Sequence, residues 1–127
     1  MTNRAIISTP NAPEAIGPYS QAVKVGNTVW LSGQIPLVPG TMELVAGDIQ
    51  EQARQVFSNL AAVAEAAGGS LSSAVKINIS LTDMADFAAV NEVMAEFLQP
   101  PFPARACVQV AGLPKGVAIE VEAILAV

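Results

Sequence analysis

The sequence predicts an α+β sandwich in which one mostly antiparallel sheet carries both helices on one face. Three observations predict this class: strand-like segments fill the first third of the chain, two segments with helical periodicity follow, and one strand-like segment separates those helices from each other. The chain has 127 residues, 52% of them hydrophobic, which fits one compact domain over residues 1–127. Only 13% of the residues are charged, so we expect the open face of the sheet to pack against another subunit of a closed homo-oligomer.

Three strands are expected in the N-terminal third, at residues 5–8, 22–25 and 28–31. Gly26 and Asn27 have the composition of a tight hairpin turn between the second and third of these strands. A loop punctuated by proline and glycine then runs from residue 33 to residue 47.

The first helix is expected to begin after Asp48, because Asp48 and Glu51 resemble a capping box. Gly68 and Gly69 should end it. Its apolar residues recur at helical spacing and are Ala53, Val56, Phe57, Leu60, Val63 and Ala64.

A half-buried strand at residues 75–81 follows, because apolar and polar residues alternate there. Asp83 should cap the second helix, which must end before Pro100. The apolar stripe of this helix consists of Phe87, Val90, Met94, Phe97 and Leu98, and the polar Asn91 falls inside it.

Two strands close the chain, at residues 105–110 and 117–127, and we expect them to pair as a hairpin. If the apolar faces of both strands share the core, the partners are Val110 with Val117, Val108 with Ile119 and Ala106 with Val121. Cys107 then lies opposite Glu120, and Arg105 opposite Glu122 and diagonal to Glu120. This cluster is either a structural ion pair or an anion site in which Arg105 grips a carboxylate and Glu120 handles water and protons.

Composition excludes several kinds of chemistry. Without histidine the chain can form no Ser-His-Asp or Cys-His nucleophile pair and no histidine-ligated metal centre. The net charge of -5 and the lack of a basic cluster disfavour nucleic-acid binding. One cysteine, no signal-peptide pattern and no long apolar run indicate a soluble cytoplasmic protein without a membrane partner.

Five segments in the expected order closely resemble the RidA/YjgF family of reactive-intermediate deaminases: AIGPYSQAV, LSGQIP, DFAAVNEV, FPARACVQV and AIEVEAI. The resemblance spans residues 5–127. It implies a chorismate-mutase-like (bacillus-type) sandwich with a mostly antiparallel mixed sheet, assembled as a homotrimer with active sites between subunits. It also implies hydrolysis of 2-imino acids such as 2-iminobutanoate and 2-iminopropanoate to 2-keto acids and ammonia, with no metal and no organic cofactor.

The resemblance also implies roles for residues at matching positions. Arg105 would hold the substrate carboxylate, Glu120 would position water and exchange protons, and Cys107 would line the catalytic pocket without acting as a thiolate. Further residues expected to bind substrate are Tyr19, Ser32, Gly33 and Asn91. The link at residues 99–102 is shorter than is usual in the family.

Two other functions use parts of the same pattern. A noncatalytic trimer that senses 2-keto acids or related carboxylates would need Arg105 and could dispense with Glu120. A chorismate mutase must bind a dianion, and a total of six lysines and arginines argues against it.

Overall fold

The structure is a computed structural model that describes residues 4–127. Residues 1–3, which belong to the expected domain of residues 1–127 and to the N-terminal segment considered for a signal peptide, lie outside the described residues. Its strands are β1 (Arg4–Ile7), β2 (Ala22–Val25), β3 (Thr28–Gln34), β4 (Ala74–Leu81), β5 (Ala104–Gln109) and β6 (Ile119–Ala126). Its α-helices are α1 (Ile49–Ala66) and α2 (Phe87–Phe97). Among the residues described, no helix is both long and apolar enough to cross a membrane.

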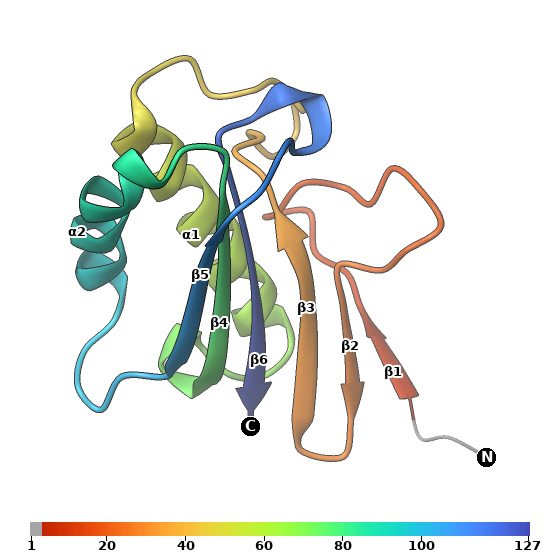
Figure 1. Ribbon diagram of the computed structural model, residues 1–127. Coiled ribbons are helices and arrows are strands. Elements are labelled where there is room, and N and C mark those ends of the chain that lie inside the picture. Colours follow the sequence, from red (N-terminus) through yellow and green to blue (C-terminus); the bar gives the residue numbers. More distant parts are fainter. Residues whose placement is uncertain (1–3) are drawn as a thin grey trace.

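The six strands form one sheet in the order β1-β2-β3-β6-β4-β5, and both helices cover the same face of it (Figure 1). All neighbouring strands are antiparallel except β4 and β5, which are parallel. The predicted class, with a mostly antiparallel sheet and two helices on one face, is therefore confirmed.

The helix α1 begins and ends where the sequence indicates. The Asp48 carboxylate accepts a hydrogen bond of 2.9 Å from the Glu51 backbone N–H, and Gly68 follows the helix with a φ of 92°, which favours glycine. Phe57 of α1 is fully buried and stacks on Phe97 of α2, with ring centres 5.6 Å apart, so the two helices share one core.

The second helical segment starts differently from the prediction. Asp83 caps a single 3-10 turn, Met84–Asp86, by accepting a hydrogen bond from the Ala85 N–H, and α2 begins only at Phe87. The apolar residues Val90, Val93 and Met94 are buried as the periodicity requires.

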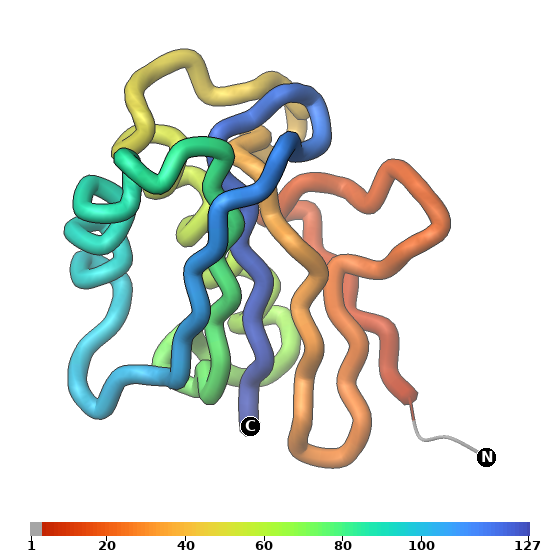
Figure 2. Tube along the Cα trace, viewed as in Figure 1, coloured from red at the N-terminus to blue at the C-terminus, as the bar shows by residue number. Residues whose placement is uncertain are grey.

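The predicted hairpin between the last two strands is wrong. The strand β6 lies between β3 and β4, and β5 pairs with β4 instead, with Ile77 beside Arg105 and Ile79 beside Cys107. Figure 2 shows how the chain leaves α2, passes through residues 98–103 and returns to start β5 next to β4. A helical crossover of this kind permits parallel pairing, which the alternation within a strand cannot reveal.

The face assigned to β5 is also wrong. Because Ile77 and Ile79 are buried in the core, their neighbours Arg105 and Cys107 point toward the helices. The sequence predicts Val108 in the core, but the residue is 51% exposed, on the opposite face of the sheet. In β6 the assigned face is correct, since Ile119 and Val121 are buried.

The sheet face away from the helices carries a continuous apolar row. Ile6, Val23, Trp30 and Ile124 stand side by side on four neighbouring strands. Ile6 is 57% exposed and Trp30 is 47% exposed. Such a row on an open sheet face is the kind of surface that proteins cover by association.

A candidate active site in two halves

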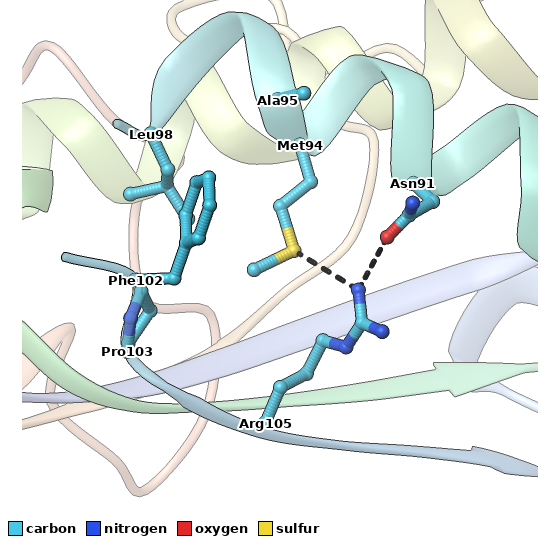
Figure 3. Close-up of a pocket in the computed structure, with 7 residues that line it drawn as sticks. All are labelled: Asn91, Met94, Ala95, Leu98, Phe102, Pro103 and Arg105. Carbon is cyan, nitrogen blue, oxygen red and sulfur yellow. Dashed lines mark hydrogen bonds between the residues drawn. The ribbon is translucent and has the colours of Figure 1, made fainter. Parts of the chain in front are cut away.

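The first half of the candidate site is built around Arg105 on the helix side of the sheet. Its guanidinium carbon lies 5.1 Å from the centre of the Phe87 ring, a cation–π arrangement, and its Nη1 donates a hydrogen bond to Asn91 Oδ1 (Figure 3). The same nitrogen lies 3.8 Å from the Met94 sulfur. Phe87, Asn91 and Met94 are four and three positions apart, so one side of α2 holds the guanidinium.

The other edge of the Arg105 guanidinium is free. Within residues 4–127, its Nε and Nη2 make no hydrogen bond, and Arg105 lines a cavity of about 400 Å³ between α2 and β5. Those two N–H groups form the fork that binds a carboxylate through two parallel hydrogen bonds. This half of the site is suited to an organic acid.

Cys107 lies on the same face of β5, two residues from Arg105. It is a free, half-buried thiol packed against the core. Burial raises the pKa of the Cys107 thiol above its ordinary value of 9.0, and the nearby Arg105 charge offsets part of that increase. A thiol with a raised pKa stays protonated at neutral pH and is not poised to act as a nucleophile.

The second half of the site is built around Glu120, which points away from the helices. Its neighbours along β6, Ile119 and Val121, are buried in the core, so alternation places Glu120 on the open face, beside Ser80 of β4. Burial raises the pKa of the Glu120 carboxyl, and the charge of Glu122 on the same face adds to the increase. A carboxyl group with a raised pKa is suited to exchanging protons with a substrate.

An irregularity in β3 makes room for the Glu120 carboxyl. The pairing between β3 and β6 shifts register between Leu31 and Gln34, and Gly33 lies within that shift. A Cβ atom on Gly33 would lie 2.1 Å from Glu120 Oε1. The Ser32 hydroxyl, in turn, donates a hydrogen bond of 2.5 Å to the Ser20 carbonyl, which fixes the loop at residues 10–20 to this irregular segment.

That loop brings Tyr19 to the Glu120 side. Gln21 is buried and holds the base of the loop, accepting from the Thr9 N–H at 2.7 Å and donating to the Pro13 carbonyl at 2.8 Å. Tyr19 is 51% exposed and, with Ser32, Gly33, Glu120 and Lys115, lines a cavity of about 510 Å³.

The structure thus separates the residues that the sequence grouped together. Arg105, Asn91 and Cys107 lie on the helix face, whereas Glu120 lies on the open face with Tyr19, Ser32 and Gly33, and β4 runs between the two strands that carry the charged groups. One small molecule cannot contact Arg105 and Glu120 of the same chain, so the predicted approach of Arg105 to Glu120 or Glu122 within one chain is wrong.

Sequence reasoning assigned three further residues of these half-sites to other roles. Phe87 and Met94 were placed in the apolar stripe of α2, although their spacing from Asn91 could have identified them as the support of a cation. Lys115 lies between the two last strands expected from the sequence; it lines the Glu120 cavity with a φ of 57°, which is unusual for a residue other than glycine. Among residues 4–127, no group of three or more His, Cys, Asp or Glu side chains could hold a metal ion.

Known proteins resemble this chain over nearly its full length. Residues 9–127 match the profile of the family described as Endoribonuclease L-PSP. A protein of Dermatophagoides farinae named 2-iminobutanoate/2-iminopropanoate deaminase is 54% identical over 127 residues, which cover 100% of this chain and 99% of that one. The crystal structure of RidA from the Antarctic bacterium Psychrobacter sp. PAMC 21119 is 58% identical, with a TM-score of 0.94 over 97% of this chain and 99% of that chain.

A further structure, that of E. coli TdcF with bound serine, is 48% identical and has a TM-score of 0.92 over 97% of this chain and 98% of that one. Identity near one half across a whole chain leaves no doubt about common descent. The chain therefore belongs to the RidA/YjgF family, the Endoribonuclease L-PSP family of the matching profile.

Proposed function

We propose that this protein hydrolyses 2-imino acids, such as 2-iminobutanoate and 2-iminopropanoate, to 2-keto acids and ammonia. The observation that carries the proposal is the Arg105 guanidinium: α2 holds it through Nη1, Arg105 lines a cavity, and within residues 4–127 its Nε and Nη2 make no hydrogen bond. The name of the relative from Dermatophagoides farinae supports the reaction, and the serine bound to E. coli TdcF supports a site that accepts a small amino or imino acid.

The two half-sites require a second copy of the chain. A neighbouring chain that packs on the open sheet face would bring its own Arg105 toward this Glu120, forming one complete site at each interface. The exposed apolar row that contains Ile6 and Trp30 supports burial of this face, and the small proportion of charged residues supports it as well. A closed ring of three such contacts gives the homotrimer that the sequence led us to expect.

The chemistry follows from the groups available. Arg105 binds the substrate carboxylate through Nε and Nη2, which orients the imine carbon toward the water held by Glu120. The water oxygen adds to the carbon of the protonated imine while Glu120 accepts one proton, which gives a carbinolamine. Glu120 passes that proton to the amine nitrogen. As the C–N bond breaks and its electron pair stays on nitrogen, the hydroxyl proton goes to Glu120 and the C=O bond of the 2-keto acid forms; Glu120 gives this proton to the ammonia, which leaves as ammonium. Because an imine carbon is already electrophilic, positioning and one proton relay suffice without a covalent nucleophile.

The word endoribonuclease in the family's description is not matched by the surface chemistry of this chain. Six lysines and arginines oppose eleven acidic residues, and one of the six, Arg54, is paired with Glu96. Neutralising a phosphate backbone requires a cluster of cations. The imine reaction requires one well-held guanidinium.

The reaction is tested by following 2-iminobutanoate that a threonine dehydratase generates in situ. We expect the protein to accelerate imine decay and ammonia release above the buffer rate, and Glu120→Gln to abolish the acceleration. Calorimetry with 2-oxobutanoate should show that Glu120→Gln still binds the carboxylate whereas Arg105→Ala does not. Carboxylate binding by the wild-type protein without any acceleration would instead identify a noncatalytic sensor.

The shared site is tested by mixing two inactive variants, Arg105→Ala and Glu120→Ala, in one preparation of reassembled trimers. If each site takes one half from each of two neighbouring chains, random mixing restores both halves in about one quarter of the sites. If each site lay within one chain, the mixture would stay inactive. The control is the same mixture without reassembly.

A further inference from the structure

Lys115 lies in the turn that leads into β6, at the cavity that Glu120 lines. The turn is a single 3-10 turn, Pro114–Gly116, and forms the short blue coil between β5 and β6 in Figure 1. The Gly116 N–H donates a hydrogen bond of 3.1 Å to the Leu113 carbonyl, which closes the turn around Lys115. The turn thus fixes the backbone from which the lysine side chain reaches the cavity of about 510 Å³.

The backbone conformation of Lys115 favours a different residue type. Its φ of 57° and ψ of 19° lie in the left-handed region, which lysine seldom adopts because its Cβ atom crowds the backbone there. Glycine adopts this region without that steric cost. The lysine side chain is exposed and, within the part of the chain that the structure describes, forms no ion pair or hydrogen bond that would offset the cost. The turn itself therefore gives no reason for a lysine at this position.

The charges around the cavity explain what a lysine contributes there. Three carboxylates line this cavity, those of Glu14, Glu120 and Glu122, and Lys115 is the only cation among the described residues that line it. The proposed substrate and its 2-keto acid product both carry a carboxylate, which the ionised glutamates repel. An ammonium group at the same cavity offsets part of that repulsion, and its effect reaches well beyond contact distance when the ionic strength is low.

We propose that Lys115 draws the carboxylate of the substrate into the Glu120 half of the site and so selects imines that carry an anionic group. This inference rests on the proposed function and names a further specificity-determining residue for it. Arg105 of a neighbouring chain holds the bound carboxylate through directed hydrogen bonds, whereas Lys115, exposed on a flexible stem, acts as a point charge. Lys115 therefore affects the capture of substrate more than the chemical step.

The first test is the affinity for 2-oxobutanoate at two ionic strengths, measured by calorimetry. Lys115→Met removes the charge and keeps the aliphatic stem, so binding at about 10 mM salt should weaken about fivefold. At about 1 M salt, where the screening length falls to about 3 Å, the variant and the wild-type protein should bind within about twofold of each other. Lys115→Arg, which keeps the charge, should bind as tightly as the wild-type protein at both ionic strengths.

Further variants separate this effect from changes in net charge or folding. Lys24→Met is the matched control, because Lys24 lies on β2 and lines neither cavity of the site; it should keep the affinity of the wild-type protein. Lys115→Gly removes the side chain and suits the left-handed backbone, so its affinity should fall while its unfolding temperature changes little. On 2-iminobutanoate at low salt, Lys115→Met should raise KM about fivefold and leave kcat nearly unchanged, a split that a folding defect would not produce.

The outcomes distinguish this inference from the proposed function. Weaker binding by Lys115→Met at low salt, without any imine hydrolysis by the wild-type protein, would refute the deaminase function and leave Lys115 as the capture residue of a carboxylate sensor. Imine hydrolysis, with equal affinities of Lys115→Met and the wild-type protein at low salt, would overturn the role of Lys115. A loss of affinity that persists unchanged at about 1 M salt, or an equal loss in Lys24→Met, would overturn it as well. So would a wild-type protein that binds no 2-oxobutanoate.

Discussion

Replacing Gly33 by alanine is a sharp test of how Glu120 is positioned. The added Cβ would lie 2.1 Å from Glu120 Oε1, 2.9 Å from Cδ and 3.0 Å from Cγ. Ordinary contact begins near 3.4 Å, so the carboxylate oxygen must move by about 1.3 Å. The φ angle of Gly33 is not in the left-handed region, so alanine fits the backbone there and only the glutamate side chain has to move.

The expected effect on stability is small and the effect on turnover is large. Moving Glu120 from its preferred rotamer costs about 0.5–1.5 kcal/mol, and the reduced freedom of the unfolded chain offsets about 0.4–1 kcal/mol of that. A displacement of about 1 Å in a catalytic group costs on the order of a hundredfold in rate. Gly33→Ala should therefore lower kcat about a hundredfold while the unfolding temperature changes little.

The assay measures kcat on 2-iminobutanoate, thermal unfolding, and calorimetric binding of 2-oxobutanoate. Binding should persist because the substitution moves the Glu120 side chain and leaves unchanged the Arg105 guanidinium that holds the carboxylate. Gly112→Ala is the matched control, because a Cβ there meets no atom within 4 Å and its φ also lies outside the left-handed region. Wild-type kcat in a folded Gly33→Ala protein would refute the proposed role of Glu120.

Three further predictions concern the pKa of Glu120, the orientation of Arg105 and the core. Glu122→Gln removes a like charge beside Glu120, which favours the ionised form of Glu120 and lowers its pKa. The acidic limb of the plot of kcat/KM against pH should therefore move to lower pH. A limb that does not move would show that Glu122 has no such effect. Asn91→Ala should raise KM about tenfold, because it removes the hydrogen-bond acceptor that holds the Arg105 guanidinium. Asn91→Asp keeps an acceptor oxygen at that position and should bind substrate nearly normally. Equal KM values for the wild-type protein and both variants would contradict the orienting role of Asn91. Phe57→Ala should lower the free energy of unfolding in urea by about 3–5 kcal/mol, against about 0.5 kcal/mol for the exposed Val75→Ala; similar losses would contradict the core assignment.

Local signals in the sequence predicted the elements well. The capping pair Asp48 and Glu51 located the start of α1, and Gly26 with Asn27 located the hairpin of β2 and β3. Both features depend on residues a few positions apart, so the information is present in the sequence. In β4 the alternation placed Ile77 correctly, whereas Val75 is 49% exposed because the pairing with β6 is irregular at that point.

The pairing of β5 could not be predicted in the same way. Arg105 and Cys107 alternate with Ala106 and Val108, and at the edge of a sheet either set can face the core. The choice depends on β4, which is more than twenty residues earlier in the chain, and on a helical crossover between the two strands. Resemblance to a family predicts that Arg105 and Glu120 are site residues, but only the fold shows that they lie on opposite sheet faces.

The position of β6 has a consequence for how the protein is made. This strand lies between β3 and β4, yet it is the last of the six to leave the ribosome. Until β6 emerges, the edge of β3 and the edge of β4 with which β6 will pair have no partner. A nascent chain that stops short of Ile119 therefore leaves one edge of β3 and one edge of β4 open, the kind of surface that chaperones cover, and the sheet can be completed only when synthesis is nearly finished.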